Sequence, residues 1–151
     1  MASSMFIPLS RIPSNIEEVR SFVHSACLEF ACLAPKVWFH SQMAVPSSLV
    51  DGFIMFEGAK PDEQCWVSIG RYTAEVTGDE GRLFLAGVQT RGDWTFASLI
   101  AYAFCKFSGQ LVFNDAGALD GQESYTVEAL RTAVSARIFQ AGRAPGIEEQ
   151  R

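Results

Sequence analysis

Residues that could do chemistry are few in this chain, which has two histidines and four cysteines among 151 residues. His24 and Cys27 are three positions apart in a segment with helical periodicity, so both side chains can lie on one side of a helix. A cysteine beside a histidine is a nucleophile with its base, the arrangement of a small Cys/His-dependent hydrolase. The apolar pattern around the pair favours a simpler interpretation, a surface histidine beside a buried cysteine.

Metal and cofactor sites are not predicted by the sequence. Zinc sites draw three or four ligands from His, Cys or carboxylates, often in pairs of close spacing, and no two cysteines here are spaced as C-x-x-C. The acidic loop NDAGALDGQES does not follow the alternating ligand order of a calcium loop, and the glycines match no phosphate-binding fingerprint. We therefore expect no catalytic residues, no metal and no cofactor. We expect reduced thiols at four positions: Cys27, Cys32, Cys65 and Cys105.

Acidic residues are distributed in a way that suggests a docking surface. The chain has 17 acids against 12 bases, which makes nucleic acid an unexpected partner because polyanion binding depends on Lys and Arg. No base lies between Lys106 and Arg131, and two predicted turns add further acids. A solvated face is the default interpretation, and an acidic surface for a basic protein is the alternative. On that alternative the predicted partner-binding residues are Asp62, Glu63, Asp79, Glu80, Asp115, Asp120 and Glu123.

The elements that must position these residues begin with an amphipathic helix. Ser14 and Glu17 have capping-box spacing, and Pro35 ends the segment. Apolar residues recur every three or four positions between them, which predicts one apolar stripe on a surface helix. The stripe consists of Ile16, Val19, Val23, Ala26, Phe30 and Leu33.

Four runs with strand character follow: KVWFHSQM, DGFIMFEG, QCWVSIGRYTAEV and RLFLAGVQT. The loops AKPDEQ and TGDEG have the composition of turns. Connections this short leave no room for the crossover helix that parallel neighbours need. We therefore predict an antiparallel meander sheet.

A helix from about Thr95 to Phe107 is predicted to be buried. Asp93 or Thr95 can cap its start, and Gly109 lies where a C-terminal glycine belongs. Its apolar residues point in nearly all directions, as in a helix that is covered on most sides. We expect this helix to pack centrally across the sheet, with QLVFND as a further strand.

The segment YTVEALRTAVSARIF predicts a last amphipathic helix, and residues 141–151 are expected to be a flexible tail. A hydrophobic content of 48% is enough for one core, so residues 1–140 should form a single α+β domain. The N-terminal residues lack the features of a secretory signal, and the longest apolar run is too short to span a bilayer. We expect a cytoplasmic protein without membrane contact.

The segment DWTFASLIAYAFCKFSGQLVFNDAG, from Asp93 to Gly117, resembles a helix, glycine, strand and Asp-Gly signature of immunity proteins from bacterial polymorphic-toxin systems. The resemblance covers about a sixth of the chain. Many of those proteins are small acidic α+β domains without catalytic residues. The resemblance implies a non-catalytic inhibitor that neutralises a cognate toxin by covering its basic active-site cleft with acidic loops.

Two other functions stay open at the level of sequence. A small ligand-binding domain would have an apolar cavity between the sheet and the central helix. A hydrolase would bring His24 or His40 to Cys27, Cys65 or a carboxylate. The inhibitor, the ligand-binding domain and the hydrolase therefore differ in which residues the tertiary structure must bring together.

Overall fold

One antiparallel sheet and a layer of helices make up the computed structural model, which describes residues 4–41, 44, 48–115, 117 and 119–143. The strand order within this part of the chain is β2-β3-β4-β5-β1-β6-β7. The strands are β1 (Met5–Leu9), β2 (Lys36–Ser41), β3 (Gly52–Glu57), β4 (Gln64–Arg71), β5 (Phe84–Gln89), β6 (Leu111–Asn114) and β7 (Ser124–Thr126). The helices are α1 (Ile16–Glu29), α2 (Ala74–Thr77), α3 (Trp94–Ser108) and α4 (Val127–Arg143), with a 3-10 turn η1 (Leu49–Asp51).

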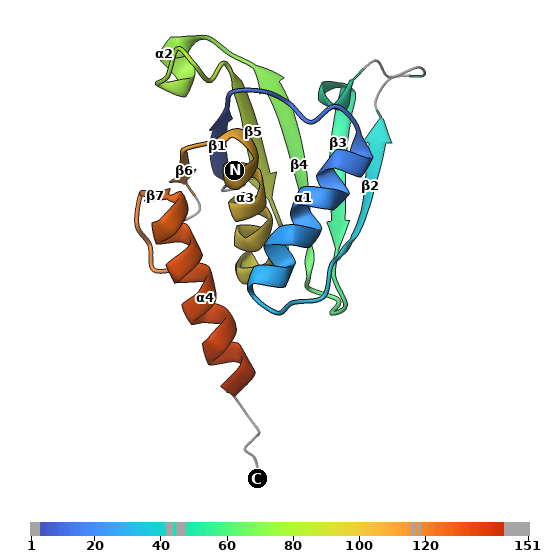
Figure 1. The fold of residues 1–151 in the computed structure, drawn as a ribbon, viewed down its shortest axis with the longest axis vertical. Coiled ribbons are helices and arrows are strands. Elements are labelled where there is room, and N and C mark those ends of the chain that lie inside the picture. Colours follow the sequence, from blue (N-terminus) through green and yellow to red (C-terminus); the bar gives the residue numbers. More distant parts are fainter. Residues whose placement is uncertain (1–3, 42–43, 45–47, 116, 118, 144–151) are drawn as a thin grey trace.

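The three long helices lie on the same side of the sheet (Figure 1). α3 packs on β1 and is flanked by α1 and α4, and every residue from Phe96 to Cys105 is buried. The core therefore fills the space between one sheet face and this helix layer. The chain is a single-domain α+β fold, as predicted, with α3 as its buried central helix.

The predicted meander is confirmed for β2, β3, β4 and β5, which pair in chain order. Its register places Trp38 opposite Met55, Met55 opposite Trp66, and Trp66 opposite Gln89. Because side chains alternate between the two faces of a strand, these four residues share the face that is turned away from the helices.

The prediction missed β1, which enters the sheet between β5 and β6. Pro8 lies inside this strand, and proline usually excludes a central position because it has no N–H to donate. Here the ladder to β6 covers only Met5 and Phe6, so the missing donor of Pro8 interrupts no pairing with that neighbour. The short strand β7, which pairs with β6, was also not predicted.

Four predicted boundaries need correction. The first helix, predicted to run to Pro35, ends at Glu29, so Leu33 lies outside α1 and is exposed. The strand predicted as far as Val76 ends at Arg71, because residues 74–77 form α2 and Gly78 closes it in the left-handed conformation (φ 78°). The cap of α1 is shifted by one residue: Asn15 accepts from the backbone N–H of Glu18 (2.9 Å), and Glu18 accepts from Ser14 N–H (2.8 Å). α4 continues to Arg143, so the first part of the predicted tail is helical, while residues 144–151 lie outside the described residues.

Both ends of α3 are determined locally. Asp93 caps the start, since its Oδ1 accepts from the backbone N–H of Thr95 (3.0 Å). At the other end the backbone N–H of Gly109 donates to the carbonyl of Cys105 (2.8 Å). A Cβ at position 109 would lie 2.7 Å from Cγ2 of Ile7, so glycine allows α3 to leave the sheet at close contact with β1.

Candidate functional site

The residues that could act in catalysis are not brought together in an activated form. His24 is exposed on α1, whereas Cys27 is buried, and burial together with the nearby Cys32 raises the pKa of its thiol to about 11. A nucleophilic cysteine needs a lowered pKa instead. A hollow beside α1 contains His24 and Glu17, but Glu17 forms an ion pair with Arg20.

His40 and Cys65 are separated by the sheet itself. His40 is opposite Phe53 in the register, on the face turned away from the helices. Cys65 is opposite Phe56 and lies in the core. In the part of the chain that the structure describes, no group of three His, Cys, Asp or Glu side chains is arranged to hold a metal ion.

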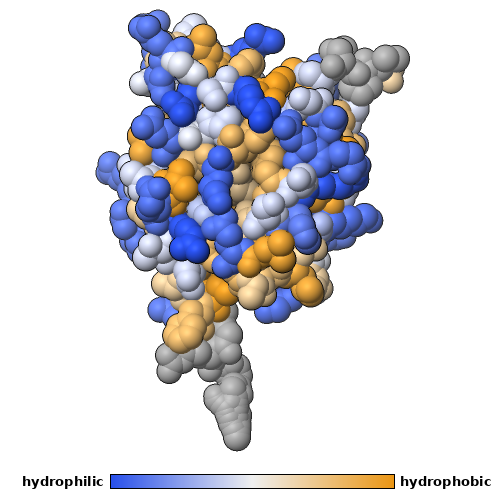
Figure 2. Space-filling model, in the orientation of Figure 1, coloured by the Kyte–Doolittle hydropathy of each residue, from blue (hydrophilic) through white to orange (hydrophobic). Residues whose placement is uncertain are grey.

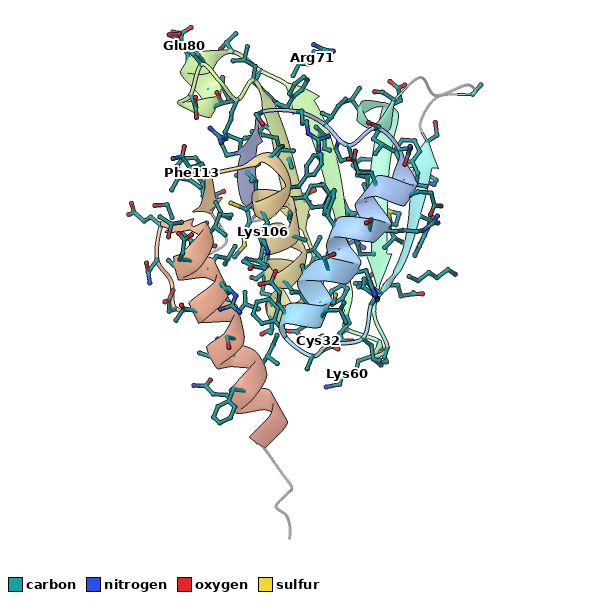
Figure 3. All side chains as sticks on the ribbon, viewed as in Figure 1. Cys32, Lys60, Arg71, Glu80, Lys106 and Phe113 are labelled. Atoms are coloured by element: carbon teal, nitrogen blue, oxygen red, sulfur yellow. The ribbon has the colours of Figure 1, made fainter. Side chains whose placement is uncertain are left out.

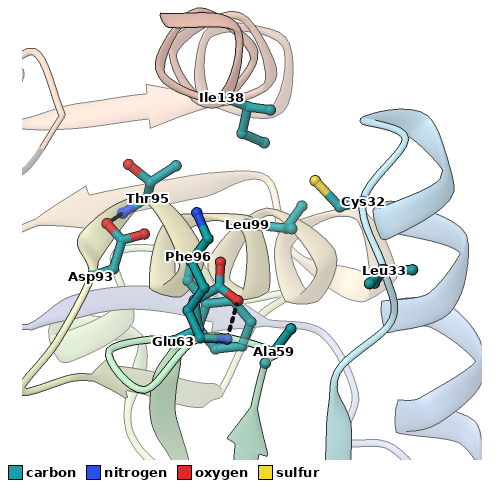
Figure 4. Close-up of a pocket in the computed structure, with 11 residues that line it drawn as sticks. Cys32, Leu33, Ala59, Glu63, Asp93, Thr95, Phe96, Leu99 and Ile138 are labelled. Atoms are coloured by element: carbon teal, nitrogen blue, oxygen red, sulfur yellow. Dashed lines mark hydrogen bonds between the residues drawn. The ribbon is translucent and has the colours of Figure 1, made fainter. Parts of the chain in front are cut away.

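An apolar pocket of about 220 Å³ opens at the lower end of the helix layer (Figure 4). The alternative of a ligand-binding domain would have its cavity between the sheet and α3, whereas this pocket lies at the edge of that space. Four segments enclose it instead: the residues after α1, the β3–β4 hairpin, the first turns of α3, and α4. Its apolar walls are formed by Leu33, Ala59, Phe96, Leu99 and Ile138, with Cys32 beside them.

Carboxylates of the β3–β4 hairpin and of the α3 cap stand at the side of this pocket. Glu63 and Asp93 both line it, and so does one base of the hairpin, Lys60. The hairpin is attached to α3 because the backbone N–H of Asp93 donates to the carbonyl of Asp62 (2.8 Å). Glu63 closes the hairpin by accepting from the backbone N–H of Lys60 (3.2 Å). Burial, and then the charge of Glu63, raise the pKa of the Cys32 thiol at the same pocket.

The rim of the pocket is apolar and accessible. The side chain of Leu33 is 83% exposed, and Phe139, next to the pocket residue Ile138, is 61% exposed. Figure 2 shows hydrophobic side chains gathered at this end of the helix-covered side, over the end of α1 and over α4. An apolar hollow with an exposed apolar rim and neighbouring carboxylates can receive an apolar side chain that has a basic neighbour.

The predicted acidic surface is divided between two ends of the sheet. Asp62 and Glu63 lie in the β3–β4 hairpin, whereas Asp79 and Glu80 follow α2 at the opposite end, where Figure 3 labels Glu80 far from Lys60. The two pairs therefore do not form one cluster, because the connections before and after β4 must lie at its opposite ends.

The loop that contains Asp115, Asp120 and Glu123 is directed toward the hairpin end. β6 ends at Asn114, which is opposite Met5, and Met5 is opposite Val88 near the end of β5. The order β4-β5-β1-β6 places this loop three strand positions from the hairpin, or roughly 14 Å.

Two of the predicted acids are engaged within their own loops. Asp79 accepts from the backbone N–H of Gly81 (2.8 Å) and pairs with Arg82 (2.9 Å), and these contacts lower its pKa. Asp120 accepts from the Tyr125 hydroxyl and from Gln122 Nε2 (2.8 Å), which lowers its pKa likewise. The remaining exposed carboxylates, those best placed to meet a partner, are Asp62, Glu80, Asp115 and Glu123.

A carboxylate cluster that the sequence analysis missed joins the three long helices. Glu29 of α1 accepts from the Tyr102 hydroxyl (2.6 Å) and from Lys106 Nζ (2.5 Å) of α3, and from Arg131 Nε (3.0 Å) of α4. An available signal was the position of Glu29 in the last turn of α1, where the helix dipole disfavours an acid. The cluster fixes the end of α1, and therefore the nearby wall of the pocket.

Comparison with known proteins finds no matching family model, no matching curated protein and no matching solved structure. Among the described residues, no helix has the length and apolar character needed to cross a membrane.

Proposed function

We propose that this protein is a non-catalytic inhibitor that binds a basic partner protein. The observation that carries the proposal is the apolar pocket beside the acidic β3–β4 hairpin. In protein interfaces most of the binding energy comes from a few anchors that fill such pockets, and polar residues form the rim around them. Leu33 and Ile138 supply apolar contacts at this pocket, and Asp62 and Glu63 supply the acidic rim.

The charge distribution supports a basic partner. The chain has a net charge of −5, and Asp115 and Glu123 add exposed carboxylates toward the hairpin end of the sheet. Complementary charge mainly accelerates association, whereas a filled apolar pocket slows dissociation. The acidic loops and the pocket therefore have separable kinetic roles.

The partner class that we propose is a toxin with a basic active-site cleft, as implied by the resemblance of residues 93–117 to bacterial immunity proteins. Enzymes that act on anionic substrates have such clefts because a positive field concentrates the substrate. An acidic protein bound over the cleft would exclude the substrate. The inhibitor itself needs no catalytic group for this action.

The test uses the purified product of the gene adjacent to that of this protein, with binding kinetics and growth protection as readouts. Leu33→Glu places a charge at the apolar rim, and because Leu33 is exposed the fold should be unaffected. We expect about tenfold faster dissociation for this variant. The double variant Asp62→Asn/Asp115→Asn should instead slow association and weaken its dependence on salt.

Glu80→Gln is the matched control, since it removes one exposed carboxylate at the opposite end of the sheet. It should bind and protect as the unaltered protein does. If Leu33→Glu binds unchanged while Glu80→Gln weakens binding, the interface is at the α2 end and the pocket has no part in it. If the unaltered protein neither binds nor protects against the adjacent gene product, the toxin-inhibitor proposal is wrong.

A further inference from the structure

The face of the sheet turned away from the helices is apolar as well. In an antiparallel sheet with one buried face, the outer face is normally polar. Here the outward positions of neighbouring strands carry mainly aromatic, aliphatic and small residues, and none of the three long helices covers them. This open face consists of Phe6, Trp38, His40, Phe53, Met55, Gln64, Trp66, Ser68, Gly70, Leu85, Gly87, Gln89, Leu111 and Phe113, with Lys36 and Glu57 at its edge. Thr77 of α2 and the loop after it lie beside Pro8, which is buried.

Aromatic rings lie along the open face. A Cβ at Gly87 would lie 3.5 Å from Cε1 of Phe6, an ordinary contact distance, so the Phe6 ring lies beside the bare backbone of β5. Trp66 donates from Nε1 to Oε1 of Gln89 (3.0 Å), which satisfies the indole within the face. The indole N–H of Trp66 is therefore already paired within the face.

Charge is absent from the middle of this face. Among its described strands, the charged residues on the same side are Lys36 and Glu57, which stand opposite each other at the ends of β2 and β3. Lys36 Nζ lies 5.2 Å from the centroid of the Trp38 ring, at the β2 edge of the face. A basic partner would find no carboxylate in the centre of the face to pair with. A second copy of the same chain would meet no repulsive charge there, although each copy has a net charge of −5.

We propose that the open face binds a second copy of this chain, forming a two-fold symmetric dimer with the two sheets packed face to face. Aligned packing of apolar sheet faces is a common arrangement, and an interface with its own copy is isologous in most homodimers. Homodimer interfaces are also more apolar than transient ones. This inference does not depend on the toxin partner, because the pocket lies on the helix-covered side.

The dimensions correspond to a small interface. Six neighbouring strands from β2 to β6 span roughly 24 Å, and strands of five to six residues are roughly 17–20 Å long. The planar footprint is therefore roughly 400–500 Å² per copy. Standard interfaces bury about 800 Å² per partner, so a dimer on this face is a weak one and nearly all of the open face must take part in it.

Sedimentation equilibrium of the unaltered full chain tests the proposal, together with one variant and its control. Phe113→Glu places a charge on the open face at a side chain that is already 40% exposed. Leu33→Glu, on the other side of the molecule, is the matched control for adding a carboxylate at an exposed apolar site. We expect a micromolar dimer that is insensitive to salt, at least a tenfold weaker dimer for Phe113→Glu, and no change for Leu33→Glu.

Dilution of the unaltered protein gives a readout that needs no variant. Trp38 and Trp66 lie on the open face, so their fluorescence should shift to the red as the dimer dissociates. A chain that stays monomeric at high micromolar concentration would overturn the proposal. A dimer that Leu33→Glu weakens as much as Phe113→Glu does, or one whose dissociation leaves the tryptophan emission unchanged, would also overturn it.

Discussion

Replacing Glu29 by glutamine tests the most highly connected polar residue of the helix layer. The carboxylate accepts hydrogen bonds from Tyr102, Lys106 and Arg131, which belong to two other helices. Partial burial alone would raise its pKa, but the hydrogen bonds from Lys106, Tyr102 and Arg131 outweigh this effect and lower the pKa from 4.5 to about 2. Glu29→Gln keeps the size of the side chain and removes its charge.

The cost of the substitution follows from these contacts. If the whole fall in pKa acted on folding, the ionised form would stabilise the fold by about 3 kcal/mol. The side chains of Lys106 and Arg131 are 47% and 54% exposed, so water screens both ion pairs. We therefore expect Glu29→Gln to lower the free energy of unfolding by about 1–2 kcal/mol at pH 7.

The pH dependence has a definite sign. In the folded protein the pKa of Glu29 lies below its ordinary value. Its contribution to the free energy of unfolding is therefore fully present above about pH 4.5 and is lost as the pH falls toward 2. Urea unfolding of both proteins between pH 7 and pH 3 measures this contribution, and the difference between the two proteins should shrink toward pH 3. Glu17→Gln, which removes the exposed partner of Arg20 on the same helix, should cost less than about 0.5 kcal/mol. A Glu29→Gln difference that is absent at pH 7, or equally large at pH 3, would refute the reasoning.

Three further predictions concern the core. Phe104→Ala should lower the free energy of unfolding by about 3–5 kcal/mol, because this ring is fully buried between α1 and the sheet; an unchanged melting temperature would contradict its assignment to the core. Gly109→Ala should cost about 1–3 kcal/mol in urea unfolding, because the new Cβ would lie 2.7 Å from Cγ2 of Ile7; a neutral substitution would show that α3 can move away from β1. In timed alkylation with mass spectrometry, Cys32 should react well before Cys65, since Cys65 is buried and burial raises the pKa of its thiol; a disulfide at either position would contradict the expectation of reduced cysteines.

Local patterns in the sequence were sufficient for the elements whose partners are near in the chain. The four meander strands and the short turns between them predict antiparallel neighbours without any knowledge of the rest. The all-round apolar character of residues 96–105 likewise predicts a buried α3, because a helix that is apolar on every side must be covered on most sides. These features, and the α+β class that follows from them, are properties of short segments.

The insertion of β1 could not be predicted in the same way. Met5 pairs with Val88 and Asn114, more than eighty residues away, and nothing near Met5 in the sequence records these partners. The sequence of a single strand can indicate an apolar outer face, since runs such as FIMF lack the polar alternation of a solvated strand. That the outward residues of separate strands form one continuous surface depends on the strand order.

The sequence by itself determined the supply of functional groups: an excess of acids, few histidines, and cysteines without a ligand spacing. Only the tertiary structure decided which of them lie together. Because the connections before and after β4 lie at opposite ends of this strand, Asp62 and Glu63 are at one end of the sheet and Asp79 and Glu80 at the other. Packing of distant segments places Leu33, Phe96 and Ile138 in one pocket. The physical reason is that side-chain period and turn composition are local, whereas a pocket forms where segments distant in the chain leave space between them.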